Sequence, residues 1–167
     1  MGLAHTEHKS GLWRLAGWML VAAFVTAPLL VTSSASAGNL AILSSFNNDG
    51  EELDVATYTE GDQIVGLLGM KGPTGLRISI TFDKKKLAAF IDMVQRAYDF
   101  DFIGWKEAGS YTETDTKSPS HIVVYGGPSL RFSLTDPSVG SLDFTLNPAD
   151  VAAFQATLNQ AEGQLNP

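Results

Sequence analysis

Two stretches of the chain, 64 residues apart, share a pattern in which an alternating apolar and polar segment runs directly into an amphipathic one. The stretches are residues 78–97 (ISITFDKKKLAAFIDMVQRA) and 142–161 (LDFTLNPADVAAFQATLNQA). An Ala-Ala-Phe triplet lies at the same place in both, at residues 88–90 and 152–154. A period of two is typical of a half-buried strand, and apolar residues three and four apart form a stripe on a helix. Each helix therefore needs a sheet to cover, and the recurrence predicts an internal repeat.

Helix-start residues lie at corresponding places in the two stretches. Asp83 and Asn147 are expected N-caps, since their side chains can accept hydrogen bonds from free helix N–H groups. Pro148 suits a first helical position, and Gly163 is expected to end the second helix. The expected apolar stripes are Leu87, Phe90, Ile91, Val94 and Ala97 in the first helix, and Val151, Phe154, Gln155, Leu158 and Ala161 in the second.

Three further strand-like segments, separated by turn-forming residues, precede each of these stretches. The expected strands are residues 40–46, 53–59, 64–70 and 76–82 in the first half, and 102–111, 120–125, 130–134 and 141–146 in the second. The chain is therefore predicted to be α+β: a tandem ββββα repeat in which two helices cover antiparallel sheet. The repeats span about residues 39–100 and 101–165, and we expect them to pack together, because neither alone buries much apolar surface.

This element order resembles that of the Pur-alpha-like single-stranded DNA binders. The resemblance lies in the order of the elements, and no sequence motif of those proteins is present, so no functional residue is carried across. A fold does not by itself specify a function.

The first 37 residues have the three parts of a secretory signal peptide. Lys9 and Arg14 form a basic start, residues 15–31 form an uncharged apolar run, and Ala35-Ser36-Ala37 is a cleavage tripeptide. An uncleaved membrane anchor is the alternative, but it needs about 20 apolar residues, and this run is shorter and contains Pro28. We expect cleavage after Ala37, which leaves residues 38–167 as a single exported domain in a periplasm or outside the cell.

Charge and cysteine content exclude several classes of function. The chain carries 11 basic and 18 acidic residues and no cysteine. The absence of cysteine excludes thiol catalysis, thiolate metal sites and disulfides. A net charge of -7 disfavours nucleic acid as a partner, and contact with a membrane is expected only through the signal segment before cleavage. No cofactor motif is present.

Candidate ligand-binding residues are Trp105, Tyr111 and His121. Trp105 belongs to an aromatic cluster between the repeats, which we interpret mainly as core, with a binding surface as the alternative. His121 is the only histidine after residue 37, and no serine stands in a catalytic motif, so we interpret it as an ordinary strand-end residue. We assign no catalytic residue.

Two charged segments remain as weak candidates. Lys84, Lys85 and Lys86 lie in the first turn of the first helix, where cations are disfavoured by the helix dipole. They could contact an anion or a partner, although a solvated corner is the simpler interpretation. Residues 47–54 (NNDGEELD) look like a calcium loop but fail the EF-hand pattern, and we interpret them as a hairpin turn with solvated acids. We assign no metal ligand, and an irregular weak calcium site stays open.

These observations favour a non-enzymatic exported module that binds an unknown protein partner or forms a homo-oligomer, because exposed strand edges can pair with another chain. The alternative is a small-ligand or glycan binder that uses a cleft between the halves near Trp105 and Tyr111. A hydrolase that uses His121 is the least favoured hypothesis.

Overall fold

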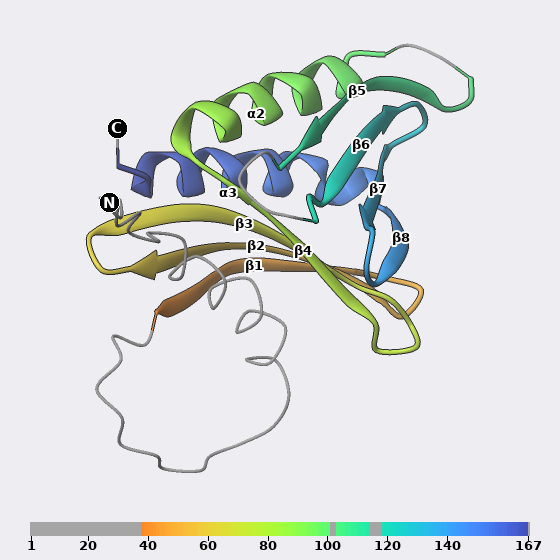
Figure 1. Ribbon diagram of the computed structural model, residues 1–167. Helices are drawn as coiled ribbons and strands as arrows, with labels where there is room; N and C mark the ends of the chain where they lie inside the picture. The colour runs from red at the N-terminus through yellow and green to blue at the C-terminus, as the bar shows by residue number, and fades with distance from the viewer. Residues whose placement is uncertain (1–37, 101–102, 114–117, 167) are drawn as a thin grey trace, which may run out of the picture. The chain divides into compact units, whose positions relative to one another are not determined.

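The computed structural model describes residues 38–100, 103–113 and 118–166, and the predicted signal segment lies outside this range (Figure 1). The first half contains β1 (Asn39–Asn48), β2 (Glu51–Glu60), β3 (Gln63–Lys71), β4 (Arg77–Phe82) and α2 (Lys84–Tyr98). The second half contains β5 (Lys106–Thr112), β6 (His121–Gly126), β7 (Leu130–Asp136), β8 (Gly140–Thr145), the short 3-10 helix η1 (Pro148–Asp150) and α3 (Val151–Gln164). The predicted mixed α+β class is confirmed. Of the helices in the described part of the chain, none has the length and hydrophobicity needed to cross a bilayer.

The strands form two antiparallel sheets of four, each in the order of the sequence. Sheet A contains β1-β2-β3-β4 and sheet B contains β5-β6-β7-β8. The turn between β1 and β2 contains Asp49 and Gly50 with φ of 50° and 83°. Two consecutive positive φ values suit a tight hairpin, so the expected turn forms at residues 49–50. Residues 51–54 belong to β2 and Asp54 is buried there, so the expectation that all the acids of this segment are solvated was wrong.

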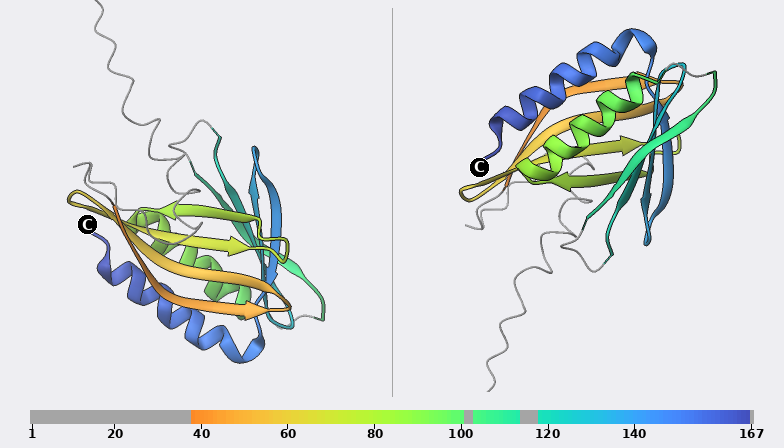
Figure 2. Two further views of the ribbon diagram at one scale, coloured as in Figure 1. Left: turned by 90° about the horizontal axis from the view of Figure 1, so that it is seen from below. Right: turned by 90° about the horizontal axis from the view of Figure 1, so that it is seen from above.

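Each helix lies largely on the sheet of the other half of the chain. Although α2 follows sheet A in sequence, it packs on β5 and β6, while also touching β3 and β4. Likewise α3 follows sheet B but packs on β1 and β2 (Figures 1 and 2). Seen from below, the strands of sheet A lie in front of the helices, so both described helices are on one face of this sheet (Figure 2).

A chain of aromatic rings runs through the core and joins both halves. Phe46 of β1 contacts Phe154 of α3 with ring centroids 5.5 Å apart, and Phe154 contacts Phe132 of β7 at 5.2 Å. Phe132 then meets Phe90 of α2 at 6.5 Å, and Phe90 meets Phe82 of β4 at 5.0 Å. The two sheets and two helices thus share one core, as expected for halves that cannot bury their apolar faces alone.

The helix ends agree only in part with the sequence predictions. The side chain of Asp83 caps α2 by accepting a hydrogen bond from the N–H of Lys86 at 2.8 Å, as predicted. Asn147 precedes η1, but its side chain makes no capping bond, and its carbonyl accepts from Asp150 instead. The expectation that Gly163 ends α3 was wrong: its φ lies outside the left-handed region, and the helix continues through it to Gln164.

The apolar stripes and one strand boundary also differ slightly. Met93 is buried in α2 while Ile91 is half-buried, and Thr157 is buried in α3 while Gln155 is half-buried. Strand β5 begins at Lys106 rather than at residue 102, because the chain bends at residues 103–104. Residues 101 and 102, where that strand was expected to start, lie outside the described residues.

Candidate functional site

Trp105 lies at the surface, immediately before β5. Its side chain is 40% exposed, so the interpretation of Trp105 as core was wrong. The reason is local: Gly104 has φ of 131°, and the bend there leaves the indole against Gly127. A Cβ at Gly127 would lie 2.0 Å from the carbonyl oxygen of Gly104 and 3.3 Å from the indole carbon Cε3, so this glycine allows the backbone of Gly104 to approach closely, with the edge of the indole beside it.

Tyr111 points to the opposite side of sheet B, toward the core. Its ring stacks on Phe82 with centroids 4.7 Å apart, and its hydroxyl donates to the carbonyl of Thr81 at 3.1 Å. Glu113 reinforces the same junction, since its Oε1 accepts from both N–H and Oγ of Thr81 at 2.6 Å. Tyr111 therefore ties β5 to β4, and it does not share a surface with Trp105.

His121 begins β6, at the end of the strand opposite Gly126 and hence away from Trp105. Its Nδ1 is 2.7 Å from Oγ1 of Thr112, its pairing partner in β5. The neighbouring Ser120 is buried and directs its hydroxyl to Asp136 at 3.4 Å, not to His121. Trp105, Tyr111 and His121 thus lie in three separate places.

The lysine run follows the helix cap of α2. Lys86 forms an ion pair with Asp83 at 3.4 Å, while Lys85 is exposed and Lys84 is half-buried. The capping carboxylate therefore offsets part of the positive charge at this helix start. Within the described residues, no three His, Asp or Glu side chains are arranged to hold a metal ion.

Among the strands that the structure describes, β1 has the least protected outer edge. β1 pairs only with β2 among the described strands, and its sequence (NLAILSSFNN) contains neither a charged residue nor proline. Ile42 in the middle of this strand is 50% exposed. A bulge between Ile42 and Ser44 is the one irregularity of the pairing. We call this feature the β1 edge.

The other three edge strands have features that hinder pairing with a second chain, namely charged residues, a bulge, or backbone groups that are already hydrogen-bonded. In β4, the N–H of Thr81 is already bonded to Glu113. β5 has Lys106 and Glu107 at its start and a bulge before Gly109. β8 contains Asp143, and the last carbonyl of this strand, from Thr145, accepts a hydrogen bond from the side chain of Asn48 at 2.7 Å. The β1 edge stands out by contrast.

A second distinct surface is the side of sheet B that faces away from the core. It consists of three cross-strand rows: Glu107–Tyr125–Arg131–Thr145, Ser110–Val123–Ser133–Asp143 and Thr112–His121–Thr135–Ser141. The alternate residues of the same strands, such as Ile122, Phe132 and Phe144, are buried in the core. We call these rows the sheet B outer face. Its members are half-buried or exposed, and Val123 is the sole aliphatic one.

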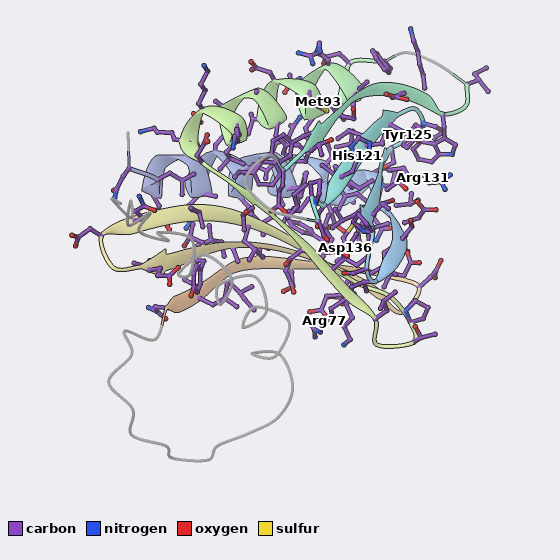
Figure 3. The ribbon with its side chains drawn as sticks, in the orientation of Figure 1. Arg77, Met93, His121, Tyr125, Arg131 and Asp136 are labelled. Atoms are coloured by element: carbon purple, nitrogen blue, oxygen red, sulfur yellow. The ribbon has the colours of Figure 1, made fainter. Side chains whose placement is uncertain are left out.

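At one end of this face, Arg131 contacts both Asp143 and Tyr125. Its Nη2 is 2.8 Å from Oδ2 of Asp143, and its guanidinium lies 6.0 Å from the ring centroid of Tyr125. Figure 3 shows Tyr125 and Arg131 together on β6 and β7, with His121 at the far end of β6. Nearby, burial raises the pKa of Glu51, repulsion by Asp143 and Asp49 adds to the rise, and Arg131 opposes it.

The chain matches no protein-family profile, and no curated protein matches its sequence significantly. The functional assignment therefore depends on the two surfaces. Sequence reasoning missed Ile42, Tyr125 and Arg131 as surface features. A signal was present in β6 and β7, since the alternation His121-Val123-Tyr125 marks the residues that point away from the core, but sequence does not show which strand lies beside which.

Proposed function

We propose that this protein is an exported, non-enzymatic interaction module that binds an extended segment of a protein partner at the β1 edge. The signal segment would direct the chain out of the cytoplasm and be removed after Ala37, and the domain that follows would be a tandem ββββα repeat. Trp105, Tyr111 and His121 lie apart, which disfavours the alternative of a ligand cleft between the halves.

The observation that carries this proposal is the chemistry of β1. A ten-residue edge strand without charge or proline is a ready template for another strand, and proteins usually block such edges. The other three edge strands are blocked here, whereas the bulge is the one feature of β1 that hinders pairing with another strand. Strand addition supplies main-chain hydrogen bonds, and an exposed side chain such as Ile42 can fill a pocket on the partner.

Charge near the β1 edge indicates what kind of segment fits. The neighbouring strand β2 carries Glu51, Glu52, Asp54 and Glu60, while β1 itself is neutral. Glu52 and Asp54 already pair with Lys71 and Arg77, so Glu51 and Glu60 are the acids that would attract an uncharged strand flanked by Lys or Arg. A second copy of this acidic chain would meet repulsion from the same groups, so a heterologous partner is favoured over self-association.

The test compares two variants that place lysine at exposed aliphatic positions. Ile42→Lys puts a charge on the β1 edge, whereas Val139→Lys puts one in the β7–β8 turn, where the side chain is 37% exposed. Tagged wild-type and variant proteins are crosslinked in the producing cells, and the adducts are identified by mass spectrometry. We expect a discrete adduct in wild type and Val139→Lys that is lost in Ile42→Lys. An adduct that survives Ile42→Lys unchanged would rule out the β1 edge as the binding site.

The same sample distinguishes the partner classes. An adduct of twice the mass that contains only this chain would show that self-association is favoured instead. The N-terminus of the purified protein is read in parallel, and a start at Gly38 would support export with cleavage after Ala37.

A further inference from the structure

We infer that the sheet B outer face, extended by Trp105, binds a neutral oligosaccharide. The inference is independent of the β1 edge, which belongs to the other sheet. It depends on three features: an exposed aromatic platform, a pre-arranged set of planar polar groups beside it, and a charge balance that disfavours anions.

Trp105 forms the platform. Its indole is substantially exposed, and one edge of the ring lies beside Gly127, where an added Cβ would be 3.3 Å from the ring carbon Cε3. A sugar ring has a face of C–H groups that stacks on an aromatic ring, and an edge of hydroxyl groups that needs hydrogen bonds. Tryptophan has only two side-chain torsions, so it loses little rotamer freedom for the contact area it offers, and stacking on Trp105 is favourable.

The polar groups lie across the strands from this platform. Tyr125 is two residues before Gly127 and pairs with Glu107, so the first row of the face begins beside the indole. Arg131, the next member of the row, is held by Asp143 at 2.8 Å. Two strand spacings separate β5 from β7, which is about 10 Å. The platform and the Arg131–Asp143 pair can therefore contact different rings of one oligosaccharide.

The charge of the face selects a neutral ligand. Glu107 and Asp143 lie on it and Glu51 lies near Arg131 and Asp143, whereas Arg131 is the only arginine or lysine in the three rows. Arg131 is already paired with a carboxylate. Phosphate, sulfate and uronate groups would meet net repulsion here. Sugar hydroxyls can donate hydrogen bonds to the carboxylates of the face, and can both donate to and accept from its hydroxyl groups. The same negative charge would repel the phosphates of a nucleic acid.

The composition of the face disfavours a protein ligand. Protein interfaces centre on fully desolvated apolar or aromatic anchors. Here the rows consist mainly of hydroxyl, amphipathic and charged side chains, with internal hydrogen bonds such as that between Thr135 and Ser141 at 2.8 Å. A flat polar sheet beside one exposed indole is better suited to a hydroxyl-rich chain.

The test measures binding of named neutral probes by titration calorimetry: hexamers of N-acetylglucosamine, β-1,4-glucose, α-1,4-glucose and xylose, with a galacturonate hexamer as the anionic comparator. At least one neutral hexamer should bind saturably, with little dependence on salt, and more tightly than the galacturonate. Trp105→Ala should weaken this binding by about tenfold or more, equivalent to about 1.4 kcal/mol. Trp105→Phe should restore part of it. Ile42→Ala, which also truncates an exposed apolar side chain but on sheet A, should bind like wild type.

Three results would overturn the inference. The first is that no neutral hexamer binds. The second is that Trp105→Ala and Ile42→Ala bind a neutral hexamer equally well, which would place the site elsewhere. The third is tighter binding of the galacturonate than of any neutral probe. Because Trp105 is exposed, its replacement should leave the unfolding temperature nearly unchanged, and this is measured for each variant.

Discussion

Replacing Gly126 with alanine should strongly destabilise the fold, because Gly126 is where the end of α2 meets sheet B. An alanine Cβ at this position would lie 1.9 Å from the carbonyl oxygen of Ala97 and 2.7 Å from its carbonyl carbon. Both are backbone atoms in the last turn of the helix, so no side-chain rotation relieves the clash. The effect is steric, since Gly126 does not have a positive φ.

The magnitude follows from how far the backbone must move. Bringing the Cβ to an ordinary contact distance requires a shift of more than about 1 Å in either β6 or α2. Overpacking of a core costs about 1–3 kcal/mol, and a clash with backbone falls at the upper end of that range. We therefore expect Gly126→Ala to lower the free energy of unfolding by about 3 kcal/mol, or roughly 10 °C in unfolding temperature.

Gly69→Ala is the matched control. Gly69 also lies in a strand without a positive φ, but a Cβ there would be 3.6 Å from the nearest atom, a side-chain carbon of Leu67. Loss of chain entropy in the unfolded state should make this variant as stable as wild type or about 0.5–1 kcal/mol more stable. Both are measured by urea unfolding. A Gly126→Ala variant within about 1 kcal/mol of Gly69→Ala would refute the packing of α2 on sheet B.

Three further predictions concern stability. Gly163→Ala should stabilise the protein by about 0.5–1 kcal/mol in chemical unfolding, because Gly163 lies inside α3 with open space around it. A loss of stability would contradict the helical conformation of residue 163. Glu113→Ala should lower the free energy of unfolding by about 1–3 kcal/mol, because it removes the acceptor for two hydrogen bonds from Thr81. Glu60→Ala, at an exposed strand end, is the control and should change it by less than about 0.5 kcal/mol. Equal losses in the two variants would contradict the contact between β4 and Glu113. Burial raises the pKa of Asp54 above its ordinary 3.8, so the folded protein binds the proton of this carboxyl group more tightly than the unfolded chain does. The free energy of unfolding should therefore fall as pH rises from about 4 through the raised pKa. Asp54→Asn should remove that fall, and unfolding curves of both proteins between about pH 4 and 7 should diverge as pH rises; parallel curves would contradict the buried carboxylate.

Local features of the fold could be predicted well from the sequence. The Asp83 cap depends on residues within one turn, and the strand-to-helix pattern depends on a single face of each element. These are short-range determinants, and the sequence carries them directly. Gly163 shows the limit, because the chain beyond it decides whether a glycine ends a helix or continues it.

The placement of the helices could not be predicted from the sequence. An apolar stripe shows that α2 must cover a sheet, but both sheets present apolar faces of similar chemistry. Phe90 contacts Phe82 in sheet A and Phe132 in sheet B, so this one residue serves both. Which sheet receives the helix depends on contacts between residues far apart in the chain.

The surface sites were also beyond sequence reasoning, for a similar reason. Trp105 was assigned to the core because it lies in an aromatic cluster, yet the bend at Gly104 turns it outward. The protection of β4 by Glu113, and the pairing of Arg131 with Asp143, each join residues from different strands. The unprotected state of β1 becomes visible only when the other three edges are compared with it.

Photo-crosslinking along β1 would show whether this edge receives a strand from another protein. A photoreactive amino acid replaces Ile42 on the β1 edge or, as a control, Val139 in the β7–β8 turn, and the protein is irradiated in the cells that produce it. We expect one dominant adduct with another exported protein from position 42 and none from position 139. Equal adducts from both positions, or none from position 42, would contradict the claim that β1 receives a partner strand.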